Sequence, residues 1–216
     1  MNKIQIAPSI LSGDFANLGK AVRDIGEWGA DLVHCDVMDG VFVKNLTFGM
    51  PMIAALKKVS TLPLDVHLMI VEPERYIDEF VRAGADMLSF HPNASKDPLA
   101  ALQKIRALGA KAGLVLNPDI PFQPYAAMFK ECDFILVMSV YAGLGGQKFI
   151  EASLEKVREI RTYLKENNID IPIEIDGGIN EITAACAREA GATILVAGSA
   201  VFKAADPALT IKSLRG

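Results

Sequence analysis

The sequence predicts an α/β protein with a single-domain (βα)8 barrel, also called a TIM barrel, and three observations favour this fold class. The 216 residues fit one domain of ordinary size, and 51% of them are hydrophobic, which is enough for one large core. A Gly-Ala step followed by an apolar run recurs near multiples of about 27 residues, an eighth of the chain. Strand-like and helical patterns alternate throughout, which is typical of a parallel sheet. We therefore expect one barrel domain over residues 1–216, with an open doubly wound sheet as the alternative.

The strand-like runs are short and rich in Val, Ile and Leu. Their apolar residues are nearly continuous, as expected of parallel strands that are buried on both faces. The eight predicted strands cover residues 4–9, 32–37, 63–69, 87–91, 112–116, 134–140, 171–176 and 193–199.

Helical patterns lie between these strands and carry recognisable start and stop signals. Asp14 and Asn180 are expected N-caps, and Pro73 is expected in a first helical turn. Glycines that end helices commonly adopt a left-handed backbone conformation, which we expect at each Gly-Ala step. The patterns are Leu18, Val22 and Ile25; Tyr76, Ile77 and Phe80; Leu154, Val157, Arg161 and Leu164; and residues 182–191, with the Gly-Ala steps at Gly29, Gly84, Gly109 and Gly191.

Composition argues against several classes of function. The formal charge is −4, and basic residues do not gather in runs, so a nucleic-acid surface or an anionic membrane surface is not expected. Three widely spaced cysteines form no CxxC pair, which argues against a disulfide framework and favours a reducing compartment. No targeting segment and no membrane-spanning apolar stretch is recognised. We therefore expect a cytoplasmic protein.

Polar side chains cluster at the predicted strand ends, where barrel enzymes place their chemistry. Side chains alternate along a strand, so His34 and Asp36 face one way and Cys35 faces the helices. The same rule directs His67 and Asp176 into the barrel. Two imidazoles and two carboxylates suit a zinc, manganese, cobalt or ferrous ion better than magnesium or calcium.

Three further residues belong to the same strands. Asp65 and Glu174 lie one layer deeper and are expected to orient metal ligands or to pair within the core. His91 ends the fourth strand without an acidic neighbour on that strand, so it ranks behind His34 and His67 as a candidate ligand.

Glycine-rich segments follow strands six, seven and eight. Backbone amides bared by glycine bind phosphate, and the loops after strands seven and eight commonly hold one in this fold, although tight turns alone also explain single glycines. A phosphorylated substrate is therefore expected, and no dinucleotide fingerprint is present. The segments are Gly143, Leu144, Gly145 and Gly146; Gly177 and Gly178; and Gly198 with Ser199.

Three methionines, Met38, Met69 and Met138, lie at or beside the same strand ends. They either fill the core or form an apolar cover over a reacting carbon, which would exclude water. Both interpretations are open at this point.

Several stretches together resemble the ribulose-phosphate 3-epimerase family, and the match covers most of the chain, from Ile6 to about Phe202. They are Ser9 in APSILSGDFANLG, HCDVMDG at 34–40, LDVHLMI at 64–70, MSV with GLGGQKFI at 138–150, EIDGGIN at 174–180 and VAGSAVF at 196–202.

The resemblance implies a (βα)8 barrel that interconverts ketose phosphates epimeric at carbon 3, with one divalent ion per subunit, no organic cofactor, and a homo-oligomeric state. It implies metal ligation by His34, Asp36, His67 and Asp176, with Asp36 and Asp176 as the acid/base pair. The substrate and phosphate contacts that it implies are Ser9, His67, residues 143–146, Asp176, Gly177, Gly178, Gly198 and Ser199.

The chain departs from the family pattern in three segments at the predicted mouth: Val41–Asn45, Tyr141-Ala142 and His91-Pro92-Asn93. D-ribulose 5-phosphate and D-xylulose 5-phosphate are the expected epimers. The His-Pro pair also resembles a sister branch, allulose-6-phosphate 3-epimerase, so epimerisation of D-allulose 6-phosphate and D-fructose 6-phosphate is the alternative. Whether residues 41–49 and 141–149 act as lids stays open.

We hypothesise two-base proton transfer at C3 through a metal-stabilised enediolate, in which one aspartate removes the proton and the other donates to the opposite face. Three other classes of protein fit these residues less well. An aldolase would need a strand-end lysine, which is missing; a metal-dependent hydrolase would not need a second facing acid. A binding protein without turnover would have no use for both aspartates.

Overall fold

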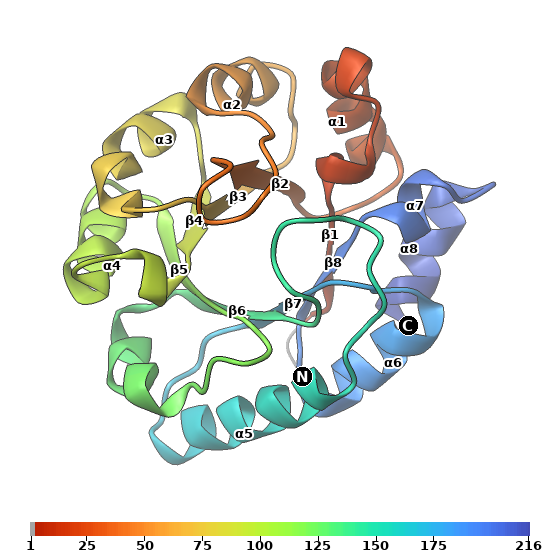
Figure 1. The fold of residues 1–216 in the computed structure, drawn as a ribbon. Coiled ribbons are helices and arrows are strands. Elements are labelled where there is room, and N and C mark those ends of the chain that lie inside the picture. The colour runs from red at the N-terminus through yellow and green to blue at the C-terminus, as the bar shows by residue number, and fades with distance from the viewer. Residues whose placement is uncertain (1–2) are drawn as a thin grey trace.

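A computed structural model describes residues 3–216 and confirms the barrel, drawn in Figure 1. Eight parallel strands are hydrogen-bonded in the order β1-β8-β7-β6-β5-β4-β3-β2, so the open doubly wound alternative is wrong. An isolated parallel bridge between Ser9 and His34 brings the two end strands of this order together. Met1 and Asn2, which open the predicted domain 1–216, lie outside the described residues.

All eight predicted strands are confirmed, and their ends differ from the prediction by at most two residues. The strands are β1 (Gln5–Pro8), β2 (Val33–Met38), β3 (Leu64–Met69), β4 (Met87–Phe90), β5 (Lys111–Leu116), β6 (Phe134–Met138), β7 (Ile173–Asp176) and β8 (Ile194–Ala197).

Helices surround the barrel, except that a 3-10 segment over Gln123–Glu131 connects β5 with β6. The α-helices are α1 (Leu18–Glu27), α2 (Met50–Lys57), α3 (Ile77–Ala83), α4 (Pro98–Ala107), α5 (Ala152–Glu166), α6 (Glu181–Ala190), α7 (Ser199–Phe202) and α8 (Pro207–Arg215). Among residues 3–216, no helix combines the length and the apolar character needed to cross a bilayer.

The expected helix signals are confirmed in part. Asn180 caps α6 through hydrogen bonds from the backbone amides of residues 182 and 183. The prediction that Asp14 caps α1 is wrong: its carboxylate accepts from the Ala16 amide and so caps a 3-10 turn at Phe15–Asn17 that precedes the helix. Pro73 likewise begins a separate 3-10 turn, and α3 starts only at Ile77. The four glycines of the Gly-Ala steps all have positive φ, as predicted.

The barrel interior is layered along its axis. Leu32, Met87, Phe134 and Ile194 lie near the strand starts and form one apolar cluster with Ala7 and Val196, which lie farther along β1 and β8. Above them the strand register places His34 beside Asp65 and Asp36 beside His67. Cys35 points outward into the core shared with the helices, as its alternation with His34 and Asp36 predicts. The polar interior layer therefore lies toward the carboxyl ends of the strands.

Candidate functional site

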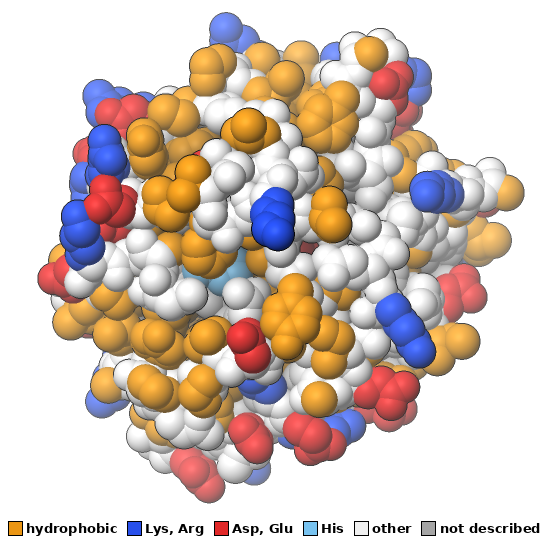
Figure 2. Space-filling model, viewed as in Figure 1, with side chains coloured by type: hydrophobic (Ala, Val, Ile, Leu, Met, Phe, Trp, Pro, Cys, Tyr) orange, Lys and Arg blue, Asp and Glu red, His pale blue; other side chains and the backbone are white. Residues whose placement is uncertain are grey.

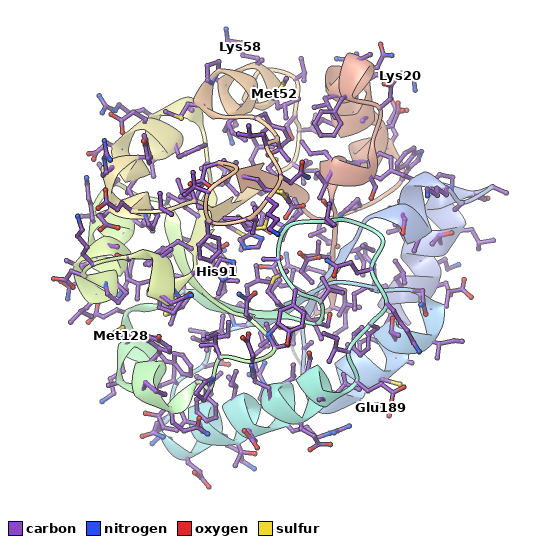
Figure 3. All side chains as sticks on the ribbon, viewed as in Figure 1. Lys20, Met52, Lys58, His91, Met128 and Glu189 are labelled. Carbon is purple, nitrogen blue, oxygen red and sulfur yellow. The ribbon has the colours of Figure 1, made fainter. Side chains whose placement is uncertain are left out.

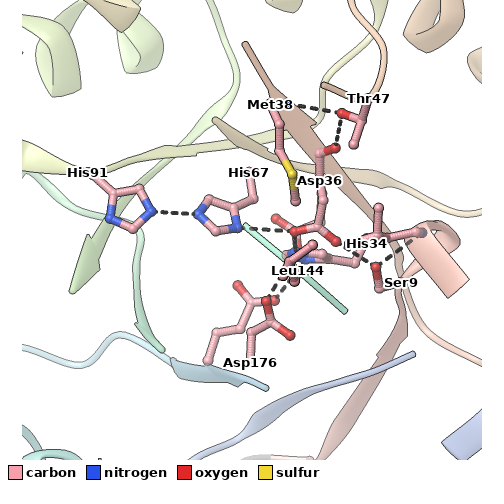
Figure 4. Close-up of polar contacts among 12 residues, drawn as sticks. Ser9, His34, Asp36, Met38, Thr47, His67, His91, Leu144 and Asp176 are labelled. Atoms are coloured by element: carbon pink, nitrogen blue, oxygen red, sulfur yellow. Dashed lines mark hydrogen bonds and ion pairs between the residues drawn. The ribbon is translucent and has the colours of Figure 1, made fainter. Parts of the chain in front are cut away.

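Four side chains from strands β2, β3 and β7 converge inside the barrel, as Figure 4 shows. One ligand atom from each of His34, Asp36, His67 and Asp176 lies within 4.8 Å of the other three. Oδ1 of Asp36 is 3.4 Å from Nε2 of His34 and 3.3 Å from Nδ1 of His67. Oδ2 of Asp176 is 4.0 Å from the same His34 nitrogen. The structure thus brings together the four residues that the sequence singled out.

Two nitrogen atoms of this cluster have no hydrogen-bond partner among the described residues. They are Nε2 of His34 and Nδ1 of His67, and both are fully buried. A buried polar atom without a partner is unfavourable, so a native protein normally supplies one. Two imidazole nitrogens and two carboxylates form a donor set that suits a borderline divalent cation. The cluster could therefore bind such a metal ion.

A second layer lies behind His34. Oδ2 of Asp65 is 2.6 Å from Nδ1 of His34, and Oε1 of Glu174 is 3.6 Å from the same nitrogen. When the ring is neutral, a hydrogen bond from Nδ1–H to Asp65 leaves Nε2 of His34 with a lone pair directed at the cluster. Burial and the nearby Asp65 charge raise the pKa of Glu174 well above its usual value, so this carboxyl is neutral.

The environments of Asp36 and Asp176 push their pKa values in opposite directions. Burial alone raises the pKa of Asp36, but His34 and His67 outweigh burial and hold it below its usual value. Burial and repulsion from Asp36 raise the pKa of Asp176 to about 7. Two carboxyl groups with such different proton affinities suit an acid and a base in one site.

The pKa values of the three histidines are also shifted in opposite directions. Burial lowers the pKa of His34, but the charges of Asp36 and Asp65 outweigh it, and the pKa lies well above its usual value. Burial dominates for His67 and His91, so the pKa of each lies below its usual value. Near neutral pH the latter two imidazoles are therefore uncharged.

A cavity of about 560 Å³ opens above the cluster at the carboxyl ends of the strands. Asp36 and Asp176 line it, and so does every residue predicted to contact substrate except His67, whose Nδ1 is 3.3 Å from Oδ1 of Asp36. The wall of the cavity contains the other predicted substrate contacts: Ser9, Gly143, Leu144, Gly145, Gly146, Gly177, Gly178, Gly198 and Ser199. The three methionines Met38, Met69 and Met138 also line the cavity.

Two glycines in this wall have backbone conformations that other residues rarely adopt. Gly177 has φ +122° and Gly178 has φ +64°, and a Cβ on Gly178 would approach the backbone of Phe149 to 2.7 Å. These positions therefore require glycine for the path of the chain. This agrees with the tight-turn interpretation that the sequence left open for single glycines.

Three hydroxyl groups fix the strand ends around the carboxylates. Ser9 Oγ donates to Oδ2 of Asp36 at 2.6 Å, so the predicted substrate contact also touches the predicted acid/base. Thr47 Oγ1 accepts from the Met38 amide and donates to the Asp36 carbonyl. Ser139 Oγ donates to the carbonyls of Asp176 and Gly177. Sequence reasoning missed Thr47 and Ser139, because both hydrogen-bond to backbone atoms whose positions only the folded chain defines.

The segments that depart from the family pattern meet at the mouth of the cavity. The Asn45 amide donates to the Gly143 carbonyl at 3.3 Å, and Val43 packs against Gly143. Phe42 lies against the His91 ring, with centroids 4.8 Å apart. Figure 2 shows histidine atoms near the centre of this face, among hydrophobic side chains. Residues 41–49 and 141–149 are therefore in contact with each other, beside the cavity.

Comparison with known proteins gives concordant results. The family model described as "Ribulose-phosphate 3 epimerase family" matches residues 5–202. The chain is 49% identical over 214 residues to a ribulose-phosphate 3-epimerase of Bacillus subtilis, covering 99% of both chains. It is 47% identical to one from Synechocystis, covering 98% of this chain and 93% of the relative. It is also 45% identical to the chloroplastic ribulose-5-phosphate-3-epimerase of Arabidopsis thaliana, covering 98% and 76%.

More distant solved structures share the fold. A 3-hexulose-6-phosphate synthase superposes with a TM-score of 0.66 at 22% identity, covering 99% of this chain and 98% of the other. A tryptophan synthase α-subunit from Pyrococcus furiosus superposes with a TM-score of 0.72 at 12% identity, covering 99% and 98%. At these identities the likeness concerns the barrel alone.

Proposed function

Because the chain belongs to the ribulose-phosphate 3-epimerase family and is therefore an epimerase, an enzyme of the isomerase class, we propose that it interconverts D-ribulose 5-phosphate and D-xylulose 5-phosphate. The observation that carries this proposal is the cluster of His34, Asp36, His67 and Asp176 at the floor of a cavity with a glycine-rich wall. Such a cavity offers an acid/base pair at one end and backbone amides for a phosphate group at the other.

A divalent ion, zinc, manganese, cobalt or ferrous iron, fits this cluster. His34 would use Nε2 and His67 would use Nδ1, the two buried nitrogens without partners, and Asp36 and Asp176 would each supply an oxygen. When bound, the cation supplies a Lewis acid that stabilises negative charge on the oxygens of the substrate. No organic cofactor is needed for a proton transfer of this kind.

Inversion at C3 requires removal of a proton from one face and delivery of a proton to the other. Asp36 and Asp176 lie on different strands, β2 and β7, and both reach the cavity. In one direction the ionised member removes the C3 proton, which leaves an enediolate, and the protonated member donates to the opposite face. The roles exchange in the reverse direction. The pKa of Asp36 is lowered and the pKa of Asp176 is raised, which supports one ionised and one protonated carboxyl group in the site.

The remaining cavity residues have supporting roles in this proposal. The backbone amides of residues 143–146, 177–178 and 198–199 bind the phosphate, and the hydroxyls of Ser9 and Ser199 contact the sugar phosphate. Ser9 also orients Asp36 through its 2.6 Å hydrogen bond. Met38, Met69 and Met138 form an apolar cover that keeps water from the reacting carbon. A homo-oligomer and a cytoplasmic location stay predictions.

The test is a comparison of kcat/KM for two substrates, D-ribulose 5-phosphate and D-allulose 6-phosphate, with zinc-loaded enzyme. We expect the five-carbon substrate to give the higher kcat/KM. A higher value for the six-carbon substrate would instead support the hexulose alternative. That alternative rests on the His91-Pro92 pair after β4, which resembles the allulose-6-phosphate 3-epimerase branch. Failure to epimerise either sugar would contradict the proposal.

A further inference from the structure

His91 has no part in the mechanism above, yet it is buried against one of its residues. It follows β4 and points toward the barrel axis (Figure 3). Its Nε2 lies 2.9 Å from Nε2 of His67, and neither ring is exposed. The two ring centroids are 5.1 Å apart. The dashed contact in Figure 4 therefore joins a buried imidazole to a predicted metal-binding imidazole through the nitrogen that does not face the cluster.

Two imidazole nitrogens at hydrogen-bond distance need one proton between them. Two lone pairs at 2.9 Å would repel each other, and so would two N–H groups. One ring therefore donates through its Nε2 and the other accepts. If His67 donates from Nε2, its lone pair is at Nδ1; if His91 donates, Nδ1 of His67 carries the hydrogen.

The surroundings of His67 Nδ1 favour the first arrangement. This nitrogen is 3.3 Å from Oδ1 of Asp36, yet it makes no hydrogen bond to that oxygen or to any other described atom. An N–H at this position would be expected to align with the carboxylate beside it. A lone pair at this position needs no such alignment, and it faces the four-residue cluster.

We propose that His91 is a positioning residue that accepts a hydrogen bond from Nε2–H of His67 and thereby holds His67 in the tautomer whose Nδ1 binds the metal ion. This role rests on the proposed function, in which His67 is a ligand. It parallels the role of Asp65 behind His34, with one difference: Asp65 is an acidic partner, whereas the imidazole of His91 carries no negative charge. A neutral partner adds no negative charge to a site that already holds Asp36, Asp65 and Asp176.

The packing around His91 holds its ring in place. Phe42 lies on it with an interplanar angle of 44°, and Pro92 follows it directly in the chain. In the proposed tautomer the His91 proton is at Nδ1, which has no hydrogen-bond acceptor among the described residues. The ring is therefore oriented by packing and by its contact with His67, rather than by a bond of its own to the backbone.

The test is nitrogen-15 NMR of histidine-labelled protein, because the chain has only three histidines, His34, His67 and His91. Long-range proton–nitrogen correlations at about pH 8 identify which ring nitrogen carries the proton. In the metal-free and zinc-loaded wild type we expect His67 protonated at Nε2 and His91 at Nδ1. A His67 protonated at Nδ1 in the metal-free protein would overturn the proposal, and this measurement needs no variant.

Variants extend the test to metal affinity. His91→Phe keeps a ring but removes the acceptor, so we expect a mixture of His67 tautomers and a zinc Kd about 10- to 100-fold higher. His91→Asn offers a carbonyl acceptor and should restore most of both properties. Ser89→Ala is the matched control, since Ser89 is buried on β4 and its hydroxyl makes no hydrogen bond within residues 3–216, and it should leave both unchanged.

The outcomes separate the two proposals. An unchanged His67 tautomer and zinc Kd in His91→Phe would overturn the role of His91 even if the enzyme epimerises pentulose phosphate as proposed. Conversely, the wild type could show the expected tautomers but bind no zinc. That result would support the hydrogen bond between His67 and His91 and would refute the metal site of the proposed function.

Discussion

Nδ1 of His34 lies 2.6 Å from Oδ2 of Asp65, and both side chains are completely buried. Adjacent strands place the two residues side by side in register, so the contact is a direct product of the β2–β3 pairing. A carboxylate in this position fixes the histidine tautomer and increases the electron-donating power of Nε2.

Asp65→Asn should therefore weaken metal binding without removing a ligand. The amide oxygen still accepts from His34, but the negative charge is lost, and we expect zinc affinity to fall about 10- to 100-fold. Competition with a coloured chelator measures the change. Asp86→Asn is the control, because Asp86 accepts from the Leu64 amide near the start of β3, and its zinc affinity should match the wild type. Equal affinities for Asp65→Asn and wild type would refute the role of Asp65.

Metal affinity should rise with pH between about 6 and 8. The pKa of Asp176 is about 7 and the pKa of His34 is raised well above its usual value, so both groups hold protons near neutrality in the metal-free protein. Both must lose these protons to bind a cation, whereas His67 is already neutral. Calorimetry in buffers of different ionisation enthalpy should detect release of roughly one to two protons per zinc ion at about pH 7. Binding without proton release would contradict the raised pKa values of Asp176 and His34.

The two aspartates should be separable by isotope exchange. In Asp176→Asn we expect kcat for epimerisation to fall about 100- to 10,000-fold, because one of two proton-transfer groups is lost. Asp36 still faces the substrate, so one of the two epimers should exchange its C3 proton with deuterated solvent without inversion. Asp36→Asn should show exchange of the other epimer. Zinc content is measured in parallel, and loss of exchange with both epimers in a zinc-loaded variant would argue against two independent bases.

A fourth prediction concerns the barrel core beneath the site. Gly113 lies beside Phe134 in the β5–β6 register, and a Cβ at this position would collide with the Phe134 ring. Gly113→Ala should therefore lower the free energy of unfolding by about 1–3 kcal/mol, as overpacking does. Urea denaturation of the single variants and of Gly113→Ala combined with Phe134→Leu forms a double-mutant cycle. We expect the smaller side chain to relieve the collision; strictly additive effects would contradict this account.

Much of this architecture could be predicted from the sequence because it depends on local patterns. The glycines at 29, 84, 109 and 191 indicate helix ends, and apolar runs indicate buried strands, so the eight strands follow from periodicity alone. Alternation along β2 also predicted that His34 and Asp36 face inward and Cys35 outward. Local signals were less reliable for Asp14, because a cap residue favours a 3-10 turn and an α-helix start alike.

Side-chain contacts between strands and the paths of loops could not be predicted from these local patterns. Alternation places His91 on the inner face of β4, but it does not indicate that its imidazole reaches Nε2 of His67, since the two are 24 residues apart. The contact between Asn45 and Gly143 joins two loops whose paths no periodicity describes. The second contact lies where the chain departs from the family pattern, and the structure was needed to reveal that these two loops meet.

The measurement that tests the central claim most directly is proton NMR of D-ribulose 5-phosphate in deuterium oxide with the zinc-loaded enzyme. The account predicts that deuterium from the solvent replaces hydrogen at C3 as D-xylulose 5-phosphate appears, because Asp36 and Asp176 exchange protons with the medium between turnovers. Epimer formation that retains the original hydrogen at C3, or no reaction in folded and metal-loaded protein, would contradict proton transfer by these two carboxyl groups.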